Sequence, residues 1–201
     1  KEMKKEYTIL MPNMAPIHFN ILQNVFNYYG YKSELLDTCG PEIAQTGLKY
    51  VHNDTCYPAL LVIGQFIHAL QSGKYDVHKV ALMITQTGGG CRASNYIFLL
   101  RKALKKAGFE FVPVISLSFG MEKNSGFSLT LPLIRRFVGG LVYGDQLMLL
   151  SNQTKPYEVN KGESMALVAD WSDKISKMLI EGNGYTLEEI DEIFANSNLS
   201  V

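Results

Sequence analysis

One cysteine of the sequence directly follows three glycines, in a setting that favours thiolate chemistry. Gly88, Gly89 and Gly90 precede Cys91, and the apolar run 80–84 comes shortly before them. The residues behind Cys91 have the spacing of an amphipathic helix. A strand, a glycine loop and a helix N-terminus in this order hold negative charge, because unpaired backbone amides and the helix dipole meet there. We therefore predict that Cys91 is stabilised as a thiolate, the form that ligates metals and attacks electrophiles.

Two further cysteines are expected near the same place. Cys39 follows the predicted strand 33–36, and Cys56 precedes the predicted helix 59–70. Parallel sheets bind their ligands outside the carboxyl ends of the strands, so all three thiols can reach one edge of one sheet. Three is an odd number of cysteines for a chain of intracellular type. Metal ligation or redox chemistry is therefore a better interpretation of the thiols than disulfides.

The spacing of the thiols leaves three kinds of site open. No Cys-x-x-Cys pair occurs, so a zinc finger is not predicted. Three thiolates on converging loops could hold one iron–sulfur cluster with a fourth position open. Cys91 could instead be a nucleophile, with His52 as the base on a loop of the same sheet edge. The glycines alone could cradle a phosphate, although the chain lacks the Lys-Ser/Thr of a P-loop and the G-x-G-x-x-G pattern.

Polar neighbours of two cysteines are candidates for the surroundings of a cofactor. Asn53 lies shortly before Cys56, and Asn95 lies shortly after Cys91. Amide groups at such positions orient ligands and tune metal centres. Asn53 could equally cap the helix that follows it. With the backbone amides of the glycines 88–90, the two asparagines complete the predicted cofactor-binding set.

Strands and helices are predicted to alternate along most of the chain. Such alternation implies a parallel sheet with helices on both faces. We predict a doubly wound, mostly parallel four-stranded α/β sheet of the flavodoxin or Rossmann type, with a C-terminal helical extension. The expected strands are 7–11, 33–36, 80–85 and 112–118. The expected helices are 41–50, 59–70, 96–107 and 129–150, one from Pro16 to a cap at Gly30, and two near the C-terminus.

The polar stretch 151–162 is the best candidate for a linker. We expect a cluster-binding α/β domain over 7–150 and a helical extension over 151–201. The last helix is marked by a capping box of Thr186 and Glu189. The sequence starts with lysine rather than methionine, which suggests a domain cut from a longer protein.

The composition is that of a globular protein without a strong charge field. Lys+Arg and Asp+Glu balance at 19 each, so neither nucleic acid nor an acidic membrane is an expected partner. The longest apolar stretch, 59–70, is too short to span a bilayer. The charged N-terminus carries no secretion signal. We expect a cytoplasmic protein.

Two cysteine-containing segments resemble those of a known family. They are 47–58, GLKYVHNDTCYP, and 86–96, QTGGGCRASNY. The shorter segments 113–117, PVISL, and 143–145, YGD, fit the same pattern. Over roughly residues 7–150 the chain is similar to the 2-hydroxyacyl-CoA dehydratase activase-related family, whose members occur in anaerobic bacteria.

The resemblance implies an α/β domain that holds an iron–sulfur cluster, 4Fe-4S or related, on cysteines. Cys56 and Cys91 match the motifs and are the ligands it implies, with Cys39 as a third candidate from a less similar segment. An ATP-dependent activator module, in the same or a separate chain, would supply a low-potential electron. In the dehydratases, the reduced cluster passes that electron to a CoA thioester, and the resulting ketyl radical permits loss of the 2-hydroxyl. An exposed cluster of this kind is expected to be lost in an aerobic preparation.

We interpret the chain as the iron–sulfur domain of such an electron-transfer system. If it is itself an enzyme, the expected reaction is dehydratase-type lyase chemistry on a CoA ester, within a larger chain or complex. Two alternatives stay open: a metal-free flavodoxin-like module that binds a phosphate-bearing small molecule or a protein, and an enzyme with Cys91 as nucleophile. Dimerisation is also left open.

Overall fold

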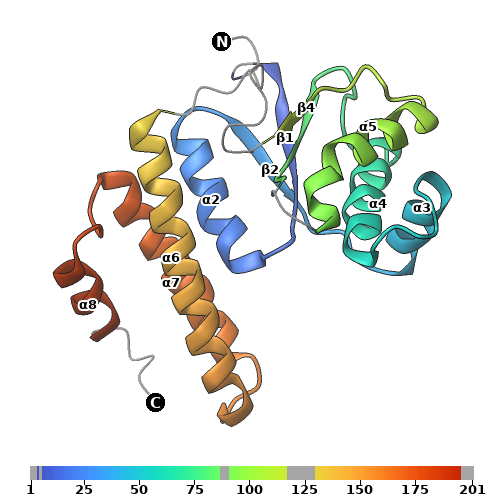
Figure 1. Ribbon diagram of the computed structural model, residues 1–201. Helices are drawn as coiled ribbons and strands as arrows, with labels where there is room; N and C mark the ends of the chain where they lie inside the picture. The colour runs from blue at the N-terminus through green and yellow to red at the C-terminus, as the bar shows by residue number, and fades with distance from the viewer. Residues whose placement is uncertain (1–3, 5, 87–90, 117–129, 196–201) are drawn as a thin grey trace. The chain divides into compact units, whose positions relative to one another are not determined.

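The chain forms two compact units. The computed structural model describes residues 4, 6–86, 91–116 and 130–195 (Figure 1). The unit that contains the sheet consists of Lys1–Met14 and Gly30–Ser128, and we call it the sheet unit. The helical unit consists of Ala15–Tyr29 and Leu129–Val201.

The sheet unit is built on four parallel strands. They lie in the order β2-β1-β3-β4, so the order reverses between β1 and β3. This is the strand order of a doubly wound α/β sheet, and the predicted fold class is confirmed. The strands are β1 (Thr8–Pro12), β2 (Lys32–Leu36), β3 (Val80–Ile84) and β4 (Val114–Ser116).

The two central strands are apolar on both faces. All five residues of β3 are buried, as are four of the five in β1. Ile9 of β1 is in register with Ser33 of β2 and with Ala81 of β3. Continuous apolar strands are typical of parallel sheets that are covered on both faces. The edge strand β2 begins with three polar residues, ends with two leucines and is mostly half-buried.

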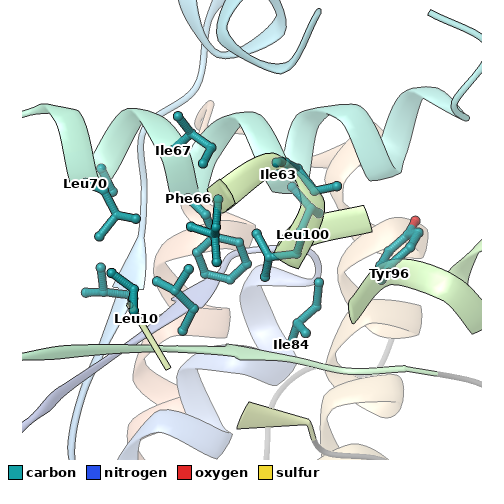
Figure 2. Packing of buried hydrophobic residues seen from close by; sticks show 14 of the residues in the cluster. Leu10, Ile63, Phe66, Ile67, Leu70, Ile84, Tyr96 and Leu100 are labelled. Carbon is teal, nitrogen blue, oxygen red and sulfur yellow. The ribbon is translucent and has the colours of Figure 1, made fainter. Parts of the chain in front are cut away.

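Three helices of the sheet unit share one core with the strands. Phe66 of α4, Leu100 of α5 and Leu10 of β1 are fully buried in it, and Figure 2 shows these side chains packed together. The predicted helical interpretation of 59–70 is confirmed. The helices are α3 (Pro41–Tyr50), α4 (Tyr57–Gln71) and α5 (Tyr96–Ala107), and the short 3-10 helix η1 (Arg92–Asn95) precedes α5.

Two glycines let α3 and α4 approach each other closely. A Cβ atom on Gly47 would lie 2.4 Å from the backbone oxygen of Leu60, and one on Gly64 would lie 2.3 Å from the backbone oxygen of Ile43. No side chain fits at either position without a shift of the helices. The close contact fixes the N-terminal half of α4 relative to α3.

Within its described residues, the helical unit contains four α-helices. Ile21, Tyr143 and Leu179 lie at the centre of its core. The helices are α2 (Pro16–Tyr28), α6 (Leu131–Thr154), α7 (Glu163–Glu181) and α8 (Leu187–Ala195), with the 3-10 turn η2 (Lys155–Tyr157) after α6. The predicted domain boundary after residue 150 therefore lies inside α6. None of the described helices combines the length and the apolarity needed to cross a membrane.

Hydrogen bonds at the helix ends of this unit follow from the sequence. The backbone N–H of Thr186 donates to Glu189 Oε2 at 3.0 Å, and the N–H of Glu189 donates to Thr186 Oγ1 at 3.2 Å. The predicted capping box at the start of α8 is thus confirmed. At the C-terminus of α7, the Arg136 side chain donates to the carbonyls of Leu179 and Ile180 at 2.9 and 3.1 Å.

Candidate functional site

Two of the predicted ligand cysteines meet at one tyrosine. The hydroxyl of Tyr96, the first residue of α5, is hydrogen-bonded to the thiol of Cys56. Cys91 is close enough for its charge to act on the same hydroxyl. Burial, then the charge and hydrogen bond of Cys56, and then the charge of Cys91, raise the pKa of Tyr96 to about 12. Tyr96 therefore stays protonated and donates toward the sulfur of Cys56.

Cys56 owes its position to the start of α4. It is the N-cap residue of that helix, and the Leu60 N–H donates to its carbonyl at 3.1 Å. The turn before it is closed by a hydrogen bond from the Thr55 N–H to the His52 carbonyl at 3.0 Å. The Cys56 side chain makes no capping bond and is half-buried against the core of the sheet unit. Cys56 thus stands at the N-terminus of a 15-residue helix.

Cys91 is held through its backbone. Ser94 donates to the Cys91 carbonyl twice, from its N–H at 3.1 Å and from its hydroxyl at 2.7 Å. The sequence predicts Cys91 at a helix N-terminus, but η1 stands between Cys91 and α5. The cysteine at the N-terminus of a long helix is therefore Cys56. The Cys91 side chain is exposed.

Among the polar side chains beside Cys91 that the structure describes, Gln86 binds the backbone and Asn95 faces solvent. Gln86 Oε1 accepts from the Ile97 N–H at 3.2 Å, which satisfies an amide in the first turn of α5. Asn95 is exposed and makes no side-chain capping bond at the start of α5. Asn53 is also exposed. The predicted glycines Gly88, Gly89 and Gly90 lie outside the described residues.

Cys39 lines a hollow at the surface of the sheet unit. The hollow has a volume of about 350 Å³ and lies beside the residues that follow β1 and β2. Gln65 of α4 fixes its wall by donating to the carbonyls of Leu36 and Thr38 at 3.0 and 2.7 Å. Its lining holds no charged residue, so it offers no countercharge to a phosphate. We call it the apolar hollow, and it is lined by Asn13, Met14, Thr38, Cys39, Gly40, Ile43, Pro58, Leu61, Val62 and Gln65.

His52, the predicted base for a Cys91 nucleophile, is in contact with Asp54. His52 Nδ1 accepts from the backbone N–H of Asp54 at 3.2 Å and lies 3.3 Å from a carboxylate oxygen of the same residue. The His52 and Asp54 side chains are 78% and 87% exposed, so solvent surrounds the pair. These contacts involve the Nδ1 atom alone.

The described residues contain no ready-made site for a single metal ion. Among them, no three or more His, Cys, Asp or Glu side chains lie close enough together to hold one. Cys56 and Cys91 both lie near Tyr96, whereas Cys39 lines the apolar hollow together with Pro58 and Leu61 of α4. None of the three cysteines takes part in a disulfide.

Tyr96 is the site residue that the sequence alone did not single out. Its signal is its place as the first residue of a helix directly behind the Cys91 segment, where a large side chain can reach the start of a neighbouring helix. Comparisons of the chain with protein-family models, with curated proteins and with solved structures find no match. The functional assignment therefore depends on the site itself.

Proposed function

We propose that the sheet unit is an iron–sulfur domain in which Cys56 and Cys91 ligate one cluster. The observation that supports the proposal is that both thiols lie near the Tyr96 hydroxyl, Cys56 within reach of a hydrogen bond and Cys91 within reach of its charge. The two cysteines come from segments far apart in the sequence, and the packing of the core does not require both of them near one polar group. A shared ligand would explain why they lie there.

The residues at the site fit a cluster better than a single ion. Thiolates are the ligands that iron–sulfur clusters use, and the site offers two cysteines. Several iron atoms separate the ligands of a cluster, so these can stand further apart than the ligands of one ion. Cys39 stays a prediction as the third ligand, and a fourth position stays open.

The bound cluster would supply one-electron chemistry. What the chain supplies is a hydrogen-bond donor at Tyr96, directed at a ligand sulfur, and an apolar floor beneath it. A donor to sulfur favours the reduced state, because it offsets the negative charge that reduction adds. These features suit an electron-transfer domain related to the 2-hydroxyacyl-CoA dehydratases and their activases, with an ATP-dependent activator as electron donor and a CoA ester as the acceptor.

The test is anaerobic reconstitution with iron and sulfide. We expect a brown protein whose iron and acid-labile sulfide bind in equal amounts, and we expect Cys56→Ala and Cys91→Ala each to lose most of both. Tyr57→Ala is the matched control, because it removes an exposed side chain next to Cys56 but no thiol. A colourless wild-type protein without bound iron would overturn the proposal.

The same samples test the nucleophile alternative. If Cys91 were a nucleophile, a mild thiol reagent would modify it at neutral pH much faster than Cys39, although both thiols are exposed. The cluster proposal predicts that reconstitution protects Cys91 and Cys56 from the reagent.

A further inference from the structure

A second hollow of the sheet unit is lined by cations. Its volume is about 660 Å³, and it lies between the exposed face of α5 and the segment that enters β4. The cations Arg101, Lys102 and Lys105 all come from α5. We call this hollow the basic groove, and its further lining is Leu104, Glu110, Phe111, Val112, Pro113 and Val114.

The basic groove has more positive than negative side chains, although the chain as a whole does not. The lining holds three cations and one acid, Glu110, in a chain whose formal net charge is zero. Lys105 Nζ lies 3.7 Å from Glu110 Oε1, but the two side chains are 72% and 70% exposed, so water screens this pair. Lys106, the remaining cation of α5, is directed elsewhere and donates to the Lys49 carbonyl at 2.6 Å. The lining of the groove thus carries more cations than acids.

Exposed aromatic side chains flank the cations. Phe98 is 65% exposed, and it precedes Arg101 and Lys102 by one helical turn, so it shares their face of α5. Phe111 is 51% exposed, and its ring stacks on His78 with a centroid distance of 4.8 Å. Arginine beside exposed aromatic rings is the composition of the energetically dominant parts of protein interfaces.

The backbone beside the groove favours an extended partner. β4 is the last strand in the sheet order, and among the described residues no strand pairs with its outer edge. The Leu82 N–H donates to the Pro113 carbonyl at 2.8 Å, so the inner edge is occupied by β3. In a parallel ladder the peptide groups of Val114 then face the outer side. An extended peptide can bind such an edge through its main chain.

We propose that the basic groove binds an extended acidic segment of a partner protein. The acidic side chains would face Arg101, Lys102 and Lys105, and apolar side chains of the segment would cover Phe98 and Phe111. The inference concerns a different surface from the cysteine site and does not depend on the cluster.

The test uses a short synthetic peptide of alternating glutamate and valine, with binding followed by fluorescence anisotropy. We expect wild-type protein to bind it, and added salt to weaken the binding. The double variant Lys102→Glu/Lys105→Glu should bind about tenfold more weakly or worse, because it reverses the local charge. Lys32→Glu/Lys161→Glu is the matched control: it makes the same change in net charge at exposed lysines outside the groove, and it should retain the wild-type affinity.

Three outcomes would overturn the proposal. One is equal weakening in both double variants, which would assign the binding to overall charge. Another is equal affinity for the peptide in which glutamine replaces glutamate. The third is displacement of the peptide by a single-stranded oligonucleotide at lower concentration than by the unlabelled peptide, which would assign the groove to nucleic acid. Circular dichroism of both variants establishes that they are folded as the wild type is.

Discussion

At the scale of single residues, Tyr96 gives the two thiols a common neighbour. Its ring belongs to the buried cluster of the sheet unit (Figure 2). Its hydroxyl lies within hydrogen-bond reach of the Cys56 thiol. A phenylalanine would fill the same space and would remove only the hydrogen-bond donor. The substitution therefore separates the packing role of Tyr96 from its effect on the sulfur.

We expect Tyr96→Phe to bind as much iron as the wild type and to have a more negative midpoint potential. The donor that offsets negative charge on the sulfur is absent in the variant, so reduction becomes less favourable. A redox titration followed by visible absorption measures the shift. Tyr75→Phe serves as the control, because its hydroxyl donates to Glu34 at 2.6 Å and not to a thiol. An unchanged potential in Tyr96→Phe would show that the hydroxyl does not act on the cluster.

A second tyrosine makes the stability of the protein sensitive to alkaline pH. Tyr143 is buried in the helical unit and donates to the Gly184 carbonyl at 2.9 Å. Burial, and after it the charges of Glu189 and Tyr185, raise the pKa of Tyr143 to about 12. The unfolded chain loses this proton near pH 10 and the folded chain near pH 12, so this contribution to stability is complete below pH 10 and is lost as pH rises to 12.

We expect Tyr143→Phe to cost about 0.5–1.5 kcal/mol at neutral pH, through the lost hydrogen bond. Between pH 10 and pH 12 the variant should lose less stability than the wild type, so the difference between them narrows. Denaturant unfolding at several pH values measures both effects. Tyr157→Phe, at a position that is 84% exposed, should follow the wild type throughout. A difference that widened with pH would contradict the expected sign.

At the scale of the elements, the start of α4 is fixed by the close contact between α3 and α4. Gly47 faces the backbone of Leu60, so the two helices touch where a side chain would separate them. Cys56 is the N-cap of the same helix and depends on its position. The contact between the glycines thus links the packing of α3 to the geometry of the site.

Gly47→Ala tests this link. A new Cβ atom would lie 2.4 Å from the Leu60 oxygen, and overpacking of this kind costs about 1–3 kcal/mol, although alanine is the better helix former. We expect a lower free energy of unfolding and a weaker retention of iron. Gln45→Ala, at an exposed position of α3, should change stability by less than about 0.5 kcal/mol. A more stable Gly47→Ala protein would show that α3 and α4 do not pack as described.

At the scale of the whole molecule, the sequence predicts the fold well because most of its signals are local. Strand β3 is an unbroken apolar run, α5 ends at a left-handed Gly108, and α8 begins with a capping box. Each of these features can be predicted from a stretch of a few residues. The boundary at 150 came from polar composition, which does not reveal that α6 continues to Thr154.

The site is harder to predict from the sequence than the fold, because it depends on packing between distant segments. The sequence singles out Cys56 and Cys91, but the helix N-terminus that it assigns to Cys91 belongs to Cys56. The contact of Cys56 with Tyr96 cannot be predicted from the spacing of residues. The same is true of the place of Cys39 in the apolar hollow. Contacts of this kind follow from how α4 and α5 pack on the sheet, which no local pattern encodes.

The most direct test of the central claim is the electron paramagnetic resonance spectrum of the reduced, reconstituted protein. Cys56→Ser and Cys91→Ser each replace a sulfur ligand by an oxygen and keep the size of the side chain. If both residues ligate one cluster, the wild type shows a single cluster signal, and each serine variant changes that same signal or abolishes it. A signal that either variant leaves unaltered, or a wild-type protein without any cluster signal, would contradict the account.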